Sequence, residues 1–494
     1  MRIIIVLLLS IISIQAKSQY KLKFKIEGLK DTSVFLARYL GDRLYYADTT
    51  KSKNGIVEFS NDNYEGGVFA VICPGPKYFE FIMADKTVEM ETSLDAFIPN
   101  MKVKKSIENK IFYDYIQFIN SKKQEADILK QQNNTTELQK LDEQVKDYQK
   151  KLVVENSNLL ISKILNMSIE PEIPEKYSNN DTLRYKYYIS HYWDNIDVRD
   201  KRIVHSPVYH NKLKFFFKKL LIQQPDTICK YATNLINQFE TGTDLFKYTV
   251  HFITYNFETS KVMGMDAVFV CMAQNYYCPR DSTLAFWLKD EKLKEICERA
   301  SALEPLLMGK KAPRIVLADT TEQKWINFYN LPQKYNLLMF WDPDCGHCKK
   351  EIPKIQKLYK ELKDKNIDLE IIAIGTSLEN KEWKEFVKEK NMNWINISDF
   401  PDANENPSKY MYEMRVTDIK SLNFRKTYDI FSTPQIYLLD KDKIIIGKKL
   451  DALTLGRLIQ MRENIELDTV KELEKIIEEK EKKDTDKQIK ESSK

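Results

Sequence analysis

Apolar and polar residues alternate with a period of two along the first part of the chain. Tyr20-Lys-Leu-Lys-Phe-Lys-Ile26 is the clearest example. This period indicates strands with one buried face. Four further short segments of strand character follow, separated by Gly, Asn or Pro: 33–39, 57–59, 67–73 and 78–82. Short strands at this spacing are typical of a sandwich, so we predict a small β-sandwich in a β-rich domain over residues 19–103.

A helical period replaces this alternation from about Ser106. Apolar side chains now recur every three or four residues, as at Ile107, Ile111, Tyr115, Phe118 and Ile119. After a loop at 170–174, the same period returns in several segments: 212–221, 226–239, 245–257 and 284–301. The pattern predicts an all-α middle domain over residues 104–305.

Strand and helix patterns alternate in the last third of the chain. Leu337–Trp341 is a short apolar strand, 349–364 has helical periodicity, and Leu369–Ile374 is a second strand. This order predicts an α/β domain over residues 306–462. The remaining residues, 463–494, are densely charged and predict a helical or disordered tail.

The first 18 residues have the pattern of a signal peptide. Arg2 is followed by an apolar run from Ile3 to Ile14, with small residues at Ala16 and Ser18 where cleavage is expected. A spanning helix needs about 20 apolar residues, which this run does not reach. We therefore expect an exported, periplasmic protein that is soluble or peripherally associated after cleavage.

The length of the chain predicts the number of domains, and its net charge limits the kinds of partner. A chain of 494 residues predicts about three domains. The net charge of +5 is too dilute for a nucleic-acid footprint, and we see no local basic patch. We therefore predict no nucleic-acid partner.

Seven cysteines raise the question of disulfides in an exported protein. Two of them form the pattern C-x-x-C. We interpret the other five as buried small apolar residues, with a bridge between Cys278 and Cys297 left open as an alternative: Cys73, Cys229, Cys271, Cys278 and Cys297.

The C-x-x-C pair, Cys345 and Cys348, lies where a buried strand meets a helix. Unpaired amides and the helix dipole stabilise a thiolate there, so Cys345 is the expected nucleophile. Cys348, one turn later, can resolve a mixed disulfide. A zinc site is disfavoured because no second ligand pair exists, and the histidines lack metal-binding spacing: His191, His205, His210 and His251. We predict no metal.

The last third resembles the thioredoxin-fold domains of the TlpA/ResA group of exported thiol-disulfide oxidoreductases. Three segments carry the resemblance: Gly309-Lys-Lys-Ala-Pro313, Cys348-Lys-Lys-Glu-Ile-Pro353 and Thr433-Pro434. The two upstream regions resemble uncharacterised domains that precede such a module in exported proteins of some Gram-negative bacteria. The resemblance implies a thioredoxin-like fold for residues 306–462.

The same resemblance implies roles for individual residues. Pro434 in cis would expose the Thr433 backbone to a substrate chain, and Trp341 is included in this substrate-binding set. Glu351 is expected to tune the thiols and move protons. Gly346-His347 between the cysteines resembles protein disulfide isomerase, and a cation at His347 favours the reduced form. Asp342 and Asp344 act in the opposite direction by repelling a thiolate, so we expect an intermediate potential.

The expected function is thiol-disulfide exchange with protein disulfides in the cell envelope, as a reductase or an isomerase. The redox-active disulfide Cys345–Cys348 is the only cofactor expected. Expected partners are protein thiols or disulfides and an electron-donor protein, with a membrane-bound donor as one alternative. A second hypothesis is an envelope scaffold in which the redox domain is subsidiary.

Overall fold

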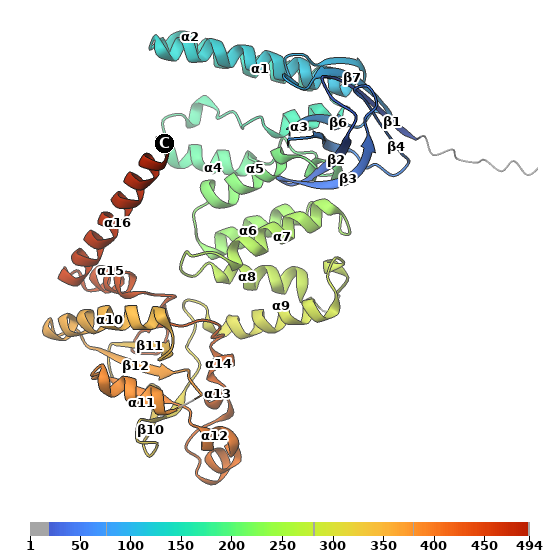
Figure 1. Cartoon of the computed structure of the whole chain (residues 1–494). Helices are drawn as coiled ribbons and strands as arrows, with labels where there is room; N and C mark the ends of the chain where they lie inside the picture. The colour runs from blue at the N-terminus through green and yellow to red at the C-terminus, as the bar shows by residue number, and fades with distance from the viewer. Residues whose placement is uncertain (1–18, 76, 280–281, 379, 493–494) are drawn as a thin grey trace, which may run out of the picture. The chain divides into compact units, whose positions relative to one another are not determined.

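The computed structural model describes residues 19–75, 77–279, 282–378 and 380–492, so the predicted signal peptide lies outside it. Two compact units are present (Figure 1). Unit 1 extends to Ile222 and includes Tyr231–His251, and unit 2 contains Gln223–Lys230 and the chain from Phe252. No helix of the described residues is long and apolar enough to cross a membrane.

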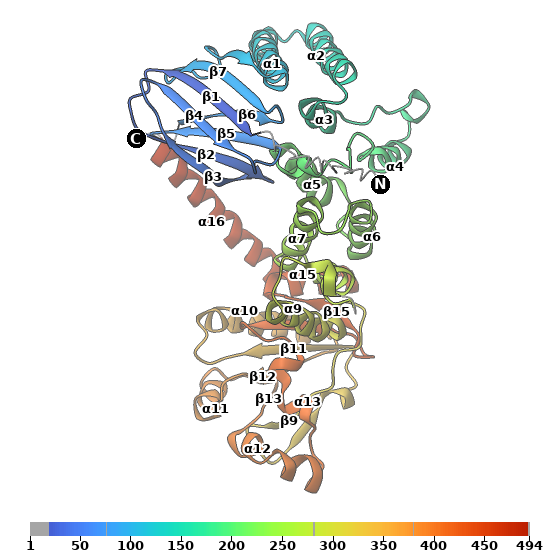
Figure 2. The same cartoon turned by 90° about the vertical axis from the view of Figure 1, so that its right-hand side faces the viewer.

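Unit 1 begins with two four-stranded sheets. Their orders are β4-β1-β7-β8 and β3-β2-β5-β6 (Figure 2). All neighbours are antiparallel except the parallel pair β1 and β7. The strands are β1 Tyr20–Glu27, β2 Ser33–Leu40, β3 Arg43–Lys51, β4 Ile56–Asn61, β5 Gly67–Cys73, β6 Lys77–Met83, β7 Thr87–Ser93 and β8 Lys102–Lys105.

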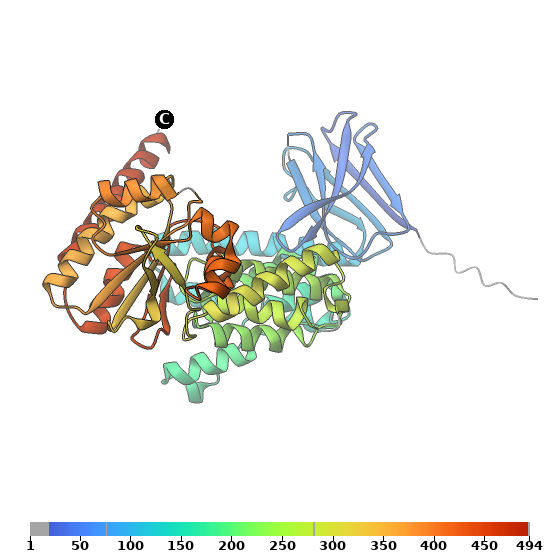
Figure 3. The same cartoon turned by 90° about the horizontal axis from the view of Figure 1, so that it is seen from below.

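The two sheets face each other and share one core (Figure 3). Leu22, Phe24 and Ile26 of β1 are buried, whereas the lysines between them are exposed. Phe24 lies against Phe81 of the opposite sheet, with ring centroids 5.1 Å apart. The alternation of polar and apolar residues therefore reflects strands with one buried face, as predicted. The predicted sandwich is confirmed.

Helices complete unit 1. They are α1 Ile107–Gln131, α2 Thr135–Glu155, α3 Leu160–Met167, α4 Asp181–His191, α5 Pro207–Phe215, and parts of α6 Pro225–Ile236 and α7 Asp244–Glu258. Buried Glu108 of α1 accepts hydrogen bonds from the N–H groups of Leu160 and Ile161, at 2.8 and 2.7 Å. This carboxylate satisfies donors that the first turn of α3 would otherwise leave unpaired.

The helical segment is divided between the two compact units. Helices α8 Asp266–Met272 and α9 Asp290–Leu303, with parts of α6 and α7, belong to unit 2. Two disulfides connect this part: Cys229–Cys271 and Cys278–Cys297. Our interpretation of four of these cysteines as apolar core residues is therefore wrong, and the Cys278–Cys297 alternative is correct. Cys73 is a buried free thiol, as predicted.

A seven-stranded sheet forms the centre of unit 2, in the order β10-β9-β13-β12-β11-β14-β15. The central strands β11, β12 and β13 are parallel, and β14 runs antiparallel to β11. The strands are β9 Val316–Asp319, β10 Trp325–Asn327, β11 Tyr335–Trp341, β12 Leu369–Gly375, β13 Ile395–Ser398, β14 Gln435–Leu439 and β15 Ile445–Lys448.

Helices cover both faces of this sheet, which explains why β11 is apolar at successive positions. Met339 and Trp341 face the core beneath one helical layer, and Phe340 faces the other. The first layer contains α10 Gly346–Asp364, α11 Asn380–Glu389, α15 Ala452–Glu463 and the start of α16 Asp468–Ser492. The second contains α12 Pro401–Glu405, α13 Ile419–Leu422 and α14 Phe424–Thr427. The predicted α/β fold is confirmed.

Candidate active site

The two cysteines of the C-x-x-C motif lie at the start of α10, just beyond the end of β11. Cys345 is the N-cap residue of α10, and its sulfur accepts a hydrogen bond from the Cys348 N–H at 3.2 Å. Cys345 is half-buried, whereas Cys348 is fully buried. Both are free thiols. The local sequence thus places one accessible sulfur at a helix N-terminus and a second sulfur beneath it.

The two thiols have opposite pKa shifts. Burial acts to raise the pKa of Cys345, but hydrogen bonds from Cys348, Thr433 and backbone N–H groups outweigh it, so the net pKa is lowered. Burial, followed by the hydrogen bond with Cys345, raises the pKa of Cys348 to about 12. Cys345 is therefore the sulfur that forms a thiolate more readily, whereas Cys348 is protonated at neutral pH.

This difference predicts how Cys345 alkylation depends on pH. Iodoacetamide reacts with the thiolate, so we expect half-maximal reactivity below about pH 8.5, the ordinary value of a free thiol. Because the pKa is lowered, reactivity should persist to lower pH than in free cysteine and disappear as pH falls through that pKa. A half-maximum at or above pH 8.5 would show that the helix terminus does not activate Cys345.

Glu351 has two structural partners. Its side chain is 13% exposed. One carboxylate oxygen accepts the Ala452 N–H at 2.6 Å, at the start of α15, and the other lies 2.8 Å from Lys354 Nζ. The carboxylate therefore anchors α15 to α10. Its expected role in tuning the thiols stays a prediction.

Glu351→Gln provides the matched comparison for the alkylation experiment. Glutamine keeps an oxygen that can accept the Ala452 N–H but removes the charge. Because a nearby negative charge disfavours a thiolate, the predicted tuning role requires the half-maximal pH to be lower in Glu351→Gln than in the wild type. Curves that coincide within a few tenths of a pH unit would contradict this role and leave Glu351 as the anchor of α15.

The segment before β14 brings a backbone carbonyl to the nucleophile. The Thr433–Pro434 peptide bond is cis, as predicted. The Cys345 thiol donates a hydrogen bond to the Thr433 carbonyl oxygen at 3.1 Å. The two residues are 88 positions apart in the sequence, so only the fold brings them together.

Two other predicted site residues, Trp341 and His347, differ in exposure: the first is buried and the second is exposed. Trp341 is fully buried in the core, with its ring 5.0 Å from that of Phe386. Its side chain cannot touch a substrate, which corrects the predicted substrate-binding role. His347 is exposed on the first turn of α10, and its backbone N–H contributes to lowering the pKa of Cys345.

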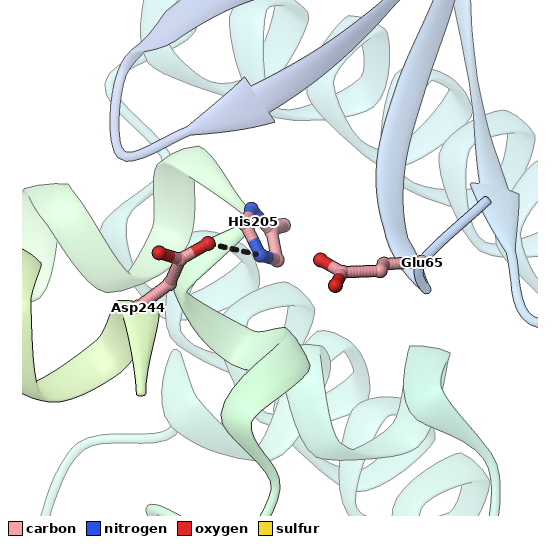
Figure 4. Close-up of side chains that lie close together, drawn as sticks. All are labelled: Glu65, His205 and Asp244. Atoms are coloured by element: carbon pink, nitrogen blue, oxygen red, sulfur yellow. Dashed lines mark ion pairs between the residues drawn. The ribbon is translucent and has the colours of Figure 1, made fainter. Parts of the chain in front are cut away.

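One histidine of unit 1 lies beside two carboxylates, Glu65 and Asp244 (Figure 4). His205 Nδ1 donates to the Tyr39 carbonyl at 2.9 Å, and Nε2 lies 3.7 Å from Asp244. Glu65 already forms an ion pair with Arg38 at 2.6 Å. These contacts give each residue a structural role, and the expectation of no metal stays a prediction.

A cavity of about 360 Å³ lies beside Pro434. Arg299 and Phe269 of the helical segment line it together with Asp429, Phe431 and Ser432 before β14. No pattern in the sequence indicates these residues. They belong to no motif, and Arg299 and Asp429 are too far apart in sequence for any local pattern to connect them.

Two protein-family models match successive parts of the chain. Residues 120–304 match a domain of unknown function, DUF5106. Residues 308–448 match the AhpC/TSA family.

Curated relatives match part of the chain. Thiol-disulfide oxidoreductase ResA from a strain of Bacillus cereus is 30% identical over 145 residues, which are 29% of this chain and 70% of the relative. ResA from Bacillus subtilis (strain 168) is 34% identical over 74 residues, which are 15% of this chain and 41% of the relative.

Solved structures with similarity to the chain include a domain of a possible thiol-disulfide isomerase from Cytophaga hutchinsonii. It is 33% identical, with a TM-score of 0.27, and the match covers 33% of this chain and 96% of that one. A thioredoxin-like protein from Bacteroides caccae is 18% identical, with a TM-score of 0.42, over 59% of this chain and 97% of its own.

Proposed function

Through its C-terminal domain the chain belongs to the ResA family of thiol-disulfide oxidoreductases, and from this premise we propose that it reduces disulfide bonds of proteins in the cell envelope. The observation that carries the proposal is the position of Cys345. Its sulfur caps α10 and contacts the Thr433 carbonyl, while Cys348 lies one turn behind it. The apolar run from Ile3 to Ile14 supports the location.

The reaction follows from the two pKa shifts. The Cys345 thiolate attacks one sulfur of the substrate disulfide, forming a mixed disulfide and releasing the other substrate sulfur as a thiolate that takes up a proton. Cys348 then loses its proton and attacks the Cys345 sulfur. This step releases the second substrate thiol and leaves the Cys345–Cys348 disulfide. Two electrons have passed from the protein to its substrate.

Continued turnover requires a reductant for the Cys345–Cys348 disulfide. A dithiol protein in the same compartment can supply two electrons by the reverse sequence of exchanges. The exposed face around His347 gives such a donor access to Cys345. An unidentified electron-donor protein is therefore the second partner in this proposal.

The direction of the reaction is tested by the midpoint potential of the Cys345–Cys348 pair. A helix-cap thiolate and a neighbouring histidine favour the reduced form, so we expect a value between about −270 mV, as in thioredoxin, and about −180 mV, as in protein disulfide isomerase. Equilibration with glutathione buffers, followed by thiol counting, measures it. A midpoint near −120 mV, as in a strong oxidant, would contradict the reductase direction.

The functional test uses the mature protein with insulin as a disulfide-bonded substrate and dithiothreitol as the electron source. We expect the protein to accelerate the appearance of insulin thiols. His347→Pro should keep this activity but shift the midpoint to a more negative value, because the variant loses an imidazole that can donate a hydrogen bond to the thiolate and matches the dipeptide of thioredoxin. An unchanged or higher midpoint would remove His347 from the site.

A further inference from the structure

The peptide bond between Trp341 and Asp342, at the end of β11, contacts the site on one side and the next loop on the other. The Asp342 N–H donates a hydrogen bond to the Cys348 sulfur. The Trp341 carbonyl accepts two hydrogen bonds from Thr376, from its N–H at 2.9 Å and from its hydroxyl at 3.1 Å. Because a peptide unit is planar, the direction of its C=O fixes the direction of its N–H. Thr376 therefore aims the Asp342 N–H at the Cys348 sulfur.

Thr376 is held in turn by Arg425 of α14. Arg425 Nε donates to the Thr376 carbonyl at 3.0 Å. The two terminal nitrogens of the same guanidinium contact the Asp399 carboxylate at 2.7 and 2.9 Å. Asp399 is 2% exposed and also accepts a hydrogen bond from Asn404 at 2.7 Å. A planar guanidinium with three fixed contacts ties the loop after β12 to the residue that follows β13.

The hydrogen bond to Cys348 matters most in the second half of the proposed reaction, when this thiol must lose its proton. Burial raises the pKa of Cys348 to about 12, whereas hydrogen bonds from the Asp342 N–H and from Thr433 act in the opposite direction. Cys348 is fully buried, so bulk water cannot stabilise its thiolate. An N–H that is already in place when the charge develops needs no reorganisation.

Cys345 depends on other donors. Its sulfur accepts the Cys348 N–H at 3.2 Å, and the His347 N–H also acts to lower its pKa. Both N–H groups belong to the first turn of α10 and not to the peptide bond at the end of β11. The two cysteines are therefore stabilised as thiolates by separate donors, and the Thr376 contacts affect the second one.

We propose that Thr376 and Arg425 are positioning residues for the resolving step, in which Cys348 attacks the mixed disulfide. They hold the peptide bond at the end of β11 so that its N–H stabilises the Cys348 thiolate, and Asp399 orients Arg425. The inference rests on the proposed function and assigns its second step to residues outside the C-x-x-C motif.

Two variants test these contacts without changing the cysteines. Thr376→Val removes the hydroxyl and keeps the shape, the backbone N–H and the ion pair of Arg425 with Asp399. Arg425→Lys keeps a positive charge beside Asp399, but an ammonium group cannot reproduce the fork that contacts both partners. Thr417→Val is the matched control, because the Thr417 hydroxyl donates to the Val316 carbonyl of β9 at 2.7 Å, and β13 and β12 separate β9 from β11.

The measurement follows the reduced protein with an excess of dithiobis(nitrobenzoate). Attack by Cys345 releases one thionitrobenzoate and leaves the other in a mixed disulfide. Cys348 then displaces the second thionitrobenzoate and closes the Cys345–Cys348 disulfide, so one reagent molecule takes up two electrons. The second release is intramolecular, so its rate does not depend on the reagent concentration. Cys348→Ser stops after the first release and assigns the two phases.

We expect Thr376→Val and Arg425→Lys to slow the second release about fivefold, as for the loss of one hydrogen bond, while the first release stays within about twofold of the wild type. Thr417→Val should match the wild type in both phases. Equal slowing of both releases, or an unchanged second release in Thr376→Val, would overturn the inference. A wild-type protein that releases no second thionitrobenzoate would instead contradict the proposed function.

Discussion

Replacing Cys345 with serine is expected to abolish disulfide reduction, lowering turnover by roughly three orders of magnitude or more, because a serine hydroxyl does not form the attacking anion. Cys348→Ser should also stop multiple turnover, but for a different reason. That variant still attacks the substrate and then remains bound to it, because no second thiol releases the product. Thiol release from insulin, followed over many turnovers and in a single turnover, separates the two losses.

Cys73→Ser is the control for this experiment. Cys73 is a free thiol in the sandwich core, and burial raises its pKa to about 11. It is therefore protonated and inaccessible at neutral pH, and its replacement should leave turnover unchanged. Wild-type turnover in Cys345→Ser would show that another sulfur is the nucleophile.

Lys448→Met is expected to cause the largest loss of stability. Lys448 and Asp266 form a buried ion pair, with side chains 2% and 5% exposed, and Lys448 Nζ also donates to the Leu306 carbonyl at 2.7 Å. Removing the lysine leaves an uncompensated buried carboxylate, which costs about 3–5 kcal/mol in the free energy of unfolding. Urea denaturation measures this loss as a lower midpoint for the unfolding of unit 2.

The double variant Lys448→Met/Asp266→Leu should recover most of that loss, since replacing both partners leaves no buried charge. Lys471→Met provides the exposed comparison, because Lys471 pairs with Glu466 at the surface. Its removal should leave the unfolding midpoint unchanged. A Lys448→Met protein as stable as the wild type would show that the pair does not connect α8 to β15 energetically.

The sequence predicted the sandwich because most of its strands have one buried face. It missed three strands, β3, β7 and β8, and two of these lie at the edges of the sheets, whereas β7 lies inside its sheet. β3 and β8 are edge strands, and their side chains are mostly exposed or half-buried, so no apolar alternation marks them. Edge strands form through backbone pairing with a neighbour, which leaves little trace in local hydrophobicity.

The grouping of the helices could not be predicted from periodicity. A period of 3.6 indicates which face of a helix is buried but not which partner buries it. The helical segment was therefore predicted to be one domain. In the structure its later helices belong to unit 2, which they join through contacts such as the ion pair of Lys448 with Asp266. The Cys229–Cys271 disulfide could not be predicted for the same reason. Its cysteines are 42 residues apart, so no local pattern pairs them.

The candidate site was predictable where its chemistry is local. Cys345 and Cys348 share a helix start, so their spacing alone indicates their roles. The prediction that Trp341 contacts the substrate was wrong, because proximity in sequence to the cysteines does not distinguish a buried strand residue from a surface residue. The proximity of Arg299 and Asp429, which lie 3.9 Å apart, could not be predicted from the sequence because 130 positions separate them.

Mass spectrometry of the Cys348→Ser protein identifies the sulfur that attacks the substrate disulfide. The reduced variant is mixed with a peptide that contains one intramolecular disulfide, quenched with acid and digested. We expect one added peptide per protein molecule, linked to Cys345 through a mixed disulfide that dithiothreitol removes. An unmodified Cys345, or an adduct carried by Cys73 instead, would contradict the assignment of Cys345 as the nucleophile of a thiol-disulfide oxidoreductase.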